Sequence, residues 1–126
     1  MKDEFILNDE TGRIIGIGIE IHKVLGAGFL EIVYKDAFEF EFLSQHIFFE
    51  REKEYQINYK NTILRHKFYA DFVVFENVIL EIKANEGGIA EEDLAQSLNY
   101  LKCSGCKVAL ILNLAKLKLE IKRVIY

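Results

Sequence analysis

The chain has 126 residues, enough for one domain built around one hydrophobic core. Hydrophobic residues make up 51% of it and aromatic residues 13%, which excludes a disordered protein. No apolar run is long enough to cross a membrane and no signal peptide is visible, so we expect a cytoplasmic protein without membrane attachment. The net charge of −4 counts against a free nucleic-acid-binding protein, because such proteins are usually basic.

Basic residues nevertheless gather in two clusters of this acidic chain. Each cluster is compatible with a solvated surface or with a local field that attracts nucleic acid, and both interpretations stay open. The first cluster consists of Lys60, Arg65, His66 and Lys67, and the second of Lys116, Lys118, Lys122 and Arg123.

The first predicted helix covers residues 13–25, where isoleucine and leucine recur at helical spacing. Asn8, Asp9 or Thr11 can cap its start. Glu20 lies on this helix among apolar neighbours. It is either a solvent-facing residue or a carboxylate directed toward a site elsewhere in the fold.

A second predicted helix covers residues 30–45 and follows a glycine-rich break at residues 26–28. Glu31 falls in its first turn, and Tyr34 lies one turn further on the same face. Compensation of the helix dipole explains a carboxylate at this position but not the spacing of glycine, glutamate and tyrosine. We therefore favour a site role for Glu31, with Tyr34 either bonded to it or simply packed.

Residues 48–59 are predicted to form a strand, because Tyr55, Ile57 and Tyr59 alternate with polar residues. The alternation implies that one face of this strand is exposed to solvent, so we expect it near a sheet edge. After a turn at residues 60–61 the chain returns and continues into the next strand.

The central hairpin is predicted over residues 69–83, where two apolar, β-branched runs flank a polar break. Asp71, Glu81 and Lys83 lie inside these runs, and buried charges need a partner or a metal ion. Glu81 and Lys83 are two residues apart, so they share a face.

The register of this hairpin decides whether the two carboxylates meet. A two-residue turn would place Asp71 opposite Ile82, with the two carboxylates on opposite faces of the sheet. Because a shared metal ion needs them on one face, we predict a three-residue loop or a bulge that places Asp71 opposite Glu81. Without metal the two carboxylates should repel each other, and only Lys83 is expected to offset them.

The last third of the chain is predicted to hold a loop, a helix and two strands. Residues 84–88 contain a glycine pair and form a candidate flap over the site. The helix covers residues 89–102, with Gln96 and Tyr100 on one face, and strands follow at residues 107–112 and 117–125. Cys103 and Cys106 form half a zinc site at most, and the simpler interpretation is two thiols in a turn around Gly105.

Three patterns carry a family resemblance that extends from Ile14 to Val124. Asp71 followed by Glu81-Ile82-Lys83 resembles the PD-(D/E)XK nuclease superfamily, although Ala70 stands where a proline is usual. The stretch Gly28-Phe29-Leu30-Glu31-Ile32-Val33-Tyr34 is similar to the motif of the GxxExxY family within that superfamily. Gln96 and Tyr100 resemble the Q-x-x-x-Y motif of recombinational repair exonucleases.

The resemblance implies an α/β fold, a single domain over residues 1–126 with a restriction-endonuclease-like core and a central mixed β-sheet flanked by helices. It implies metal-dependent hydrolysis of phosphodiester bonds, in DNA more than in RNA, with Mg²⁺ or Mn²⁺. The implied metal ligands are Asp71, Glu81, the Ile82 carbonyl, Glu31 and Glu20. The implied catalytic residues are Lys83, Glu31, Gln96 and Tyr100.

Two other functions remain open on the sequence. A non-catalytic binding or scaffold protein could retain this fold, and the acidic net charge favours it. The charges inside the hairpin oppose it, because buried charges without a role are costly. A small-molecule phosphoesterase is the third alternative. A homodimer is compatible with the sequence but not required by it, and nothing in the sequence selects a particular form of nucleic acid.

Overall fold

The computed structural model of the chain describes residues 7–126. In these residues, three helices and seven strands follow one another in an order close to the predicted one. They are α1 (Asn8–Leu25), α2 (Glu31–Ser44), β1 (Phe49–Tyr55), β2 (Asn58–Tyr59), β3 (Thr62–Ile63), β4 (Phe68–Val74), β5 (Val78–Lys83), α3 (Glu91–Ser104), β6 (Val108–Asn113) and β7 (Glu120–Ile125).

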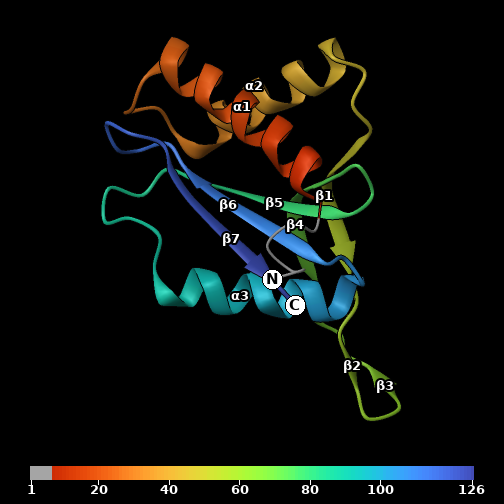
Figure 1. Cartoon of the computed structure of the whole chain (residues 1–126). Helices are drawn as coiled ribbons and strands as arrows, with labels where there is room; N and C mark the ends of the chain where they lie inside the picture. The colour runs from red at the N-terminus through yellow and green to blue at the C-terminus, as the bar shows by residue number, and fades with distance from the viewer. Residues whose placement is uncertain (1–6) are drawn as a thin grey trace.

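Five strands form one central sheet in the order β1-β4-β5-β6-β7. Within this sheet of the described residues, β5 and β6 are parallel and the other neighbouring pairs are antiparallel, so the predicted mixed sheet is confirmed. Strand β1 lies at the sheet edge, as its alternating pattern predicted. Helices α1 and α2 cover one face of the sheet and α3 covers the other, which confirms an α/β fold with flanking helices (Figure 1).

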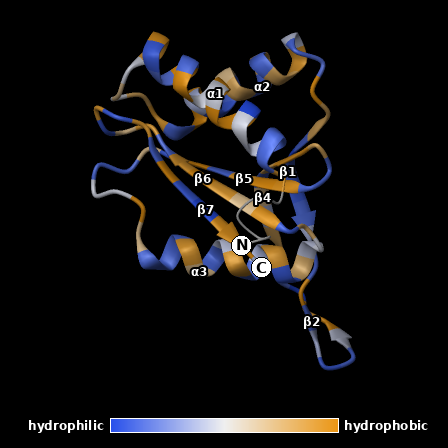
Figure 2. Ribbon diagram, in the orientation of Figure 1, coloured by the Kyte–Doolittle hydropathy of each residue, from blue (hydrophilic) through white to orange (hydrophobic). Residues whose placement is uncertain are grey.

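The core lies on both faces of the inner strands, which Figure 2 shows largely in hydrophobic colours. On the side of α1 and α2, Phe38 and Phe42 pack against Phe72, and Tyr34 belongs to the same fully buried cluster. On the side of α3 a smaller cluster includes Ile79, Tyr100 and Leu101. Because both faces are apolar, the polar side chains within these strands stand out as candidates for function.

The boundaries of two helices and one strand depart from the prediction. Helix α1 begins at Asn8 without a side-chain cap, and the Thr11 hydroxyl donates back to the Asn8 carbonyl, so the predicted cap is wrong. Strand β7 begins at Glu120, because Leu117 lies in a turn and is 97% exposed. Helix α3 ends at Ser104, beyond the predicted end at residue 102, and Gly105 caps it with a φ of 79°, with Cys103 exposed and Cys106 buried around that turn.

The strand predicted over residues 48–59 is in fact divided. It leaves the central sheet after Tyr55, and β2 pairs with β3 in a separate two-stranded sheet. This small hairpin projects from the body of the molecule below β4 (Figure 1). Within residues 7–126, no helix has both the length and the apolar character needed to cross a membrane.

Candidate metal and catalytic site

The register of β4 and β5 brings Asp71 and Glu81 face to face. Val74 pairs with Val78 and Phe72 with Leu80, which leaves a three-residue loop and confirms the predicted loop length. Two residues of that loop, Phe75 and Glu76, have φ values of 56° and 64°, in the left-handed region that such a tight connection needs. One further step along the same register places Asp71 opposite Glu81.

At that step, side chains replace the backbone ladder between the strands. The Asp71 backbone N–H donates to the Glu81 carboxylate at 2.9 Å, and the Ile82 N–H donates to the Asp71 carboxylate at 2.8 Å. The exposed fractions of Asp71 and Glu81 are only 9% and 4%. The hairpin therefore holds two buried carboxylates in fixed positions against each other.

This arrangement makes the two carboxylates hard to ionise together. Burial, and then the charge of Asp71, raise the pKa of Glu81 to about 8, although Lys83 and Lys35 act in the opposite direction. A proton or a cation therefore stabilises the pair near neutral pH.

The nearest cation to Asp71 is Lys35 on α2. Its ammonium lies 2.8 Å from the Asp71 carboxylate, 3.4 Å from Glu52 and 3.7 Å from Glu31. Burial disfavours the ammonium, but the hydrogen bond to Asp71 and the three negative charges outweigh it, so the pKa of Lys35 is raised. The expectation that only Lys83 offsets the carboxylates is wrong, because α2 supplies a second cation.

The start of α2 is fixed by Tyr34. The fully buried tyrosine hydroxyl donates to the Gly26 carbonyl at 2.6 Å and accepts from the Phe29 N–H at 3.3 Å. Gly28 has a φ of 109°, which favours glycine in this turn. Tyr34 thus bonds to the turn and not to Glu31, and Glu31 faces the site through the Lys35 ammonium that it shares with Asp71.

Lys83 lies on the same face of β5 as Glu81 and is held from α3. Its ammonium is 3.6 Å from the Asp93 carboxylate, which also accepts the Ala90 N–H at the start of the helix. Asp93 therefore joins Lys83 to the first turn of α3.

Hydrogen bonds hold the loop after Lys83 in place, which argues against the interpretation of this loop as a flap. Buried Asn113 accepts the Asn85 N–H at 3.0 Å and donates to the Asn85 carbonyl at 2.8 Å and to Glu120 at 3.0 Å. Glu120 also accepts the Ile89 N–H, and Gly88 is buried in between. These bonds brace the end of β5 where Lys83 lies.

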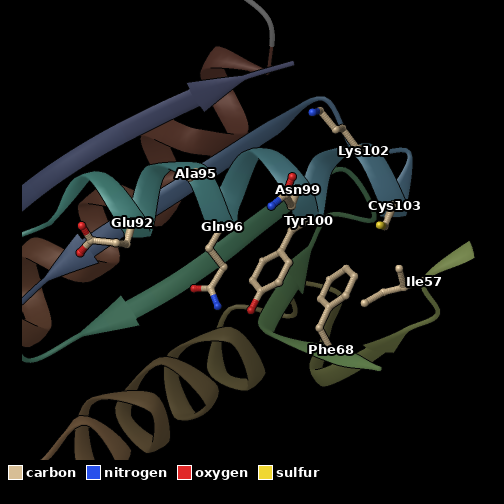
Figure 3. A pocket seen from close by; sticks show the side chains of 9 residues that line it. All are labelled: Ile57, Phe68, Glu92, Ala95, Gln96, Asn99, Tyr100, Lys102 and Cys103. Atoms are coloured by element: carbon tan, nitrogen blue, oxygen red, sulfur yellow. The ribbon is translucent and has the colours of Figure 1, made fainter. Parts of the chain in front are cut away.

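Gln96 and Tyr100 point to the same side of α3, where they line a pocket of about 580 Å³ (Figure 3). The Tyr100 ring stacks on Phe68, with centroids 4.3 Å apart. Burial, followed by the charges of Glu81 and Asp71, raises the pKa of Tyr100 to about 12, so its hydroxyl senses both carboxylates. Gln96 is exposed and makes no hydrogen bond within residues 7–126.

Glu20 is not brought to this site. It is exposed and lines an outer groove between α1 and α2, together with Val24, Phe40 and Glu41. The isoleucines of α1 take the face that packs on the sheet, and the helical period turns Glu20 away from it. We therefore exclude Glu20 from the candidate ligands.

The donor set fits a hard divalent cation that keeps part of its water shell. In the described part of the chain, no three His, Cys, Asp or Glu side chains converge closely enough to form a complete cage. Mg²⁺ is commonly bound by one or two carboxylates, with water and substrate phosphate completing the octahedron. Asp71 and Glu81 provide such a pair, and the Lys35 ammonium shows that a cation is accommodated beside Asp71.

Three residues of the site were missed from the sequence: Lys35, Glu52 and Asp93. Lys35 follows Glu31 by four residues, which is the signal for a shared helix face. Glu52 lies opposite Asp71 on β1, between the pairs Arg51–Phe72 and Lys53–Ala70. Only the pairing of β1 with β4 reveals that a row of three acidic residues crosses β1, β4 and β5 at this level.

Comparison with known proteins agrees with this geometry. The sequence pattern of the PD-(D/E)XK nuclease superfamily matches residues 8–124. A solved structure described as "Crystal structure of SSO0001" has the same fold, with a TM-score of 0.60 and 16% sequence identity. The alignment covers 74% of this chain and 48% of that one, so it spans less than half of the other chain. Comparison with curated proteins gave no match.

Proposed function

This chain belongs to the PD-(D/E)XK nuclease superfamily, and from this premise we propose that it is a GxxExxY-family nuclease that hydrolyses phosphodiester bonds of DNA with Mg²⁺ or Mn²⁺. Members of the superfamily act on nucleic acid and generally use divalent metal ions. The identity of the ion, the preference for DNA and a single functional domain over the whole chain are parts of the proposal.

One observation carries the proposal above the others. Asp71 and Glu81 are buried opposite each other, each held by a backbone donor of the facing strand, with Lys83 on the same face. A scaffold has no use for two buried carboxylates, where burial first and then the charge of Asp71 raise the pKa of Glu81. A metal-dependent hydrolase needs both carboxylates to hold the ion. It also needs a cation beside them for the charge on the phosphate, which the Lys83 ammonium on the same face supplies.

In the proposed mechanism, Asp71, Glu81 and the Ile82 carbonyl would hold the ion, and Glu31 would complete its shell directly or through water. A divalent ion bound there supplies a Lewis acid and an attacking water of lowered pKa. Lys83 stabilises the negative charge that develops on the phosphate, and Asp93 positions the Lys83 ammonium. Gln96 and Tyr100 would contact the phosphate or the water from the α3 side, which is the side their side chains share in Figure 3.

A cleavage assay on single-stranded DNA, duplex DNA, branched DNA and RNA tests the proposal. Wild type should cut at least one DNA form with Mg²⁺ or Mn²⁺ and none in EDTA. Asp71→Asn and Lys83→Ala should each reduce the rate by about 100-fold or more. Glu20→Gln is the matched control and should cut at the wild-type rate, because Glu20 lies in the outer groove.

The scaffold interpretation predicts a different outcome. No cleavage of any substrate, together with no binding of Mg²⁺ or Mn²⁺ by calorimetry, would contradict the nuclease proposal. Cleavage confined to small phosphodiesters would instead favour the phosphoesterase.

A further inference from the structure

The hairpin between β1 and β4 projects from the body of the molecule, and its role is not part of the proposed catalytic site. We call residues 56–67 the arm. Within it β2 pairs with β3 as a separate two-stranded sheet, and the Leu64 N–H donates to the Ile57 carbonyl at its base. Figure 1 shows the arm extending beyond the central sheet on the side of α3.

The arm carries the opposite charge to the rest of the chain. It contains Lys60, Arg65 and Lys67 and no acidic residue. The chain has 16 Lys and Arg against 20 Asp and Glu, so the remainder holds 13 against 20 and has a net charge of −7. None of the three cations forms an ion pair within residues 7–126. An acidic body with an unpaired basic projection fits a polyanionic partner.

The position of the arm connects it to the carboxylates. Lys67 precedes Asp71 by four residues in an extended segment, so the two lie roughly 13 Å apart. Ile57 of the arm and Phe68, which directly follows the arm, line one pocket together with Gln96 and Tyr100 (Figure 3). The charges of Glu81 and Asp71 act on the Tyr100 hydroxyl, so this pocket connects the base of the arm to the carboxylates. A polyanion that crosses the carboxylate site toward α3 therefore meets the arm next.

The aromatic residues of this region favour contact with phosphates over stacking with bases. Phe68 is stacked between Tyr55 and Tyr100, so the ring faces within that stack are already occupied. Tyr59 on the arm is 58% exposed, but the Lys60 ammonium lies 5.4 Å from its ring centroid. Single-strand binders need free aromatic platforms, whereas a two-stranded ribbon fits the major groove of duplex DNA.

We propose that the arm is a binding element for duplex DNA, which contacts the phosphates next to the position of cleavage. This inference rests on the proposed nuclease function for the identity of the partner. Lys60 at the turn and Arg65 and Lys67 on the returning segment supply the charge. The exposed side chains of Tyr59 and Ile63 face the groove without a requirement for sequence.

Binding of a fluorescent duplex, measured by anisotropy in EDTA over a range of salt concentrations, tests the arm separately from cleavage. The variant replaces Lys60, Arg65 and Lys67 with glutamine. The matched control replaces Lys116, Lys118 and Lys122 with glutamine, which removes the same charge at the other basic cluster. Melting temperatures of both variants verify that they are folded.

The arm variant should bind the duplex about 10-fold more weakly or worse, and its salt dependence should fall by roughly 2 to 3 in log–log slope. The control should change affinity less than 3-fold. Equal weakening of both variants, or no change in the arm variant, would overturn the proposal, and so would arm-dependent binding that prefers single strands or RNA to duplex.

The two proposals can fail separately. Duplex binding through the arm without cleavage in any metal would leave the arm proposal intact and refute the nuclease. Metal-dependent cleavage at wild-type rate and affinity by the arm variant would refute the arm alone.

Discussion

Lys35 neutralises Asp71, and an ion bound to Asp71 would compete with its ammonium for the same oxygen. Replacing Lys35 with Met keeps the length and removes the charge, which leaves a buried carboxylate without its cation. In EDTA, Lys35→Met should lose about 3 kcal/mol in the free energy of unfolding. Saturating Mg²⁺ should recover most of that loss, and calorimetry should show tighter metal binding than in wild type. Lys53→Met, at an exposed surface pair, should match wild type in both measurements. A metal affinity of Lys35→Met equal to or weaker than wild type would contradict this competition.

Glu81 should make the stability of the metal-free protein depend on pH. Its pKa is about 8 in the folded chain against 4.5 when unfolded, so the folded state holds the proton more tightly. The stabilisation from this proton is complete below about pH 4.5 and is lost as the pH rises to about 8. Urea denaturation in EDTA should show a loss of roughly 4 kcal/mol for wild type between these values. Glu81→Gln should lack this component and Glu20→Gln should retain it. Parallel curves for wild type and Glu81→Gln would disprove the assignment.

At the residue scale, sequence reasoning could reach what depends on a single hairpin. Asp71 and Glu81 were predicted to face each other because a shared metal ion needs both carboxylates on one face, which fixes the register of the hairpin. The role of Lys35 could not be predicted from the sequence, because its contact with Asp71 depends on how α2 lies over β4. Glu52 was missed for a similar reason, since only the β1–β4 pairing places it beside Asp71.

The start of α2 is the element that carries Glu31 and Lys35 to the site. Tyr34→Phe removes a hydroxyl that serves both the Gly26 carbonyl and the Phe29 N–H, and should cost about 1 to 2 kcal/mol in stability. It should also weaken metal binding several-fold, because the turn that positions α2 is loosened. The exposed Tyr59→Phe is the control and should change neither. A variant with wild-type stability and affinity would mean that packing alone fixes this turn.

The boundaries of helices and strands could be predicted where the apolar pattern is long. The prediction failed where polar contacts between distant residues determine the conformation of the chain. The alternation of β1 correctly placed it at the edge, but the chain leaves the sheet at Tyr55 to form the arm. The loop after Lys83 looked mobile from its glycines, yet Asn113 fixes it through bonds that span 28 residues. No local pattern reports such a contact.

For the molecule as a whole, metal binding should couple to global stability. An ion at about 100 times its dissociation constant adds about 2.7 kcal/mol, on the order of 5 to 10 °C in melting temperature for a domain of this size. Asp71→Asn should lose most of this gain, whereas Lys83→Ala should keep it and lose only cleavage. Without metal, Asp71→Asn gives up the Lys35 ion pair but relieves the repulsion from Glu81, so its stability should change little. Absence of a metal-dependent shift in wild type and both variants would favour the scaffold.

The side-chain bonds that replace the ladder between β4 and β5 also provide a built-in spectroscopic probe. The Asp71 amide proton points at the Glu81 carboxylate, and the Ile82 amide proton points at the Asp71 carboxylate. The chemical shift of each amide therefore reports the charge on one candidate ligand. In ¹H–¹⁵N NMR spectra both resonances should move together on titration with Mg²⁺, while the Val73 amide in the regular part of the same strand moves little. Because this signal needs no substrate, it would locate the ion even before any cleavable nucleic acid is known.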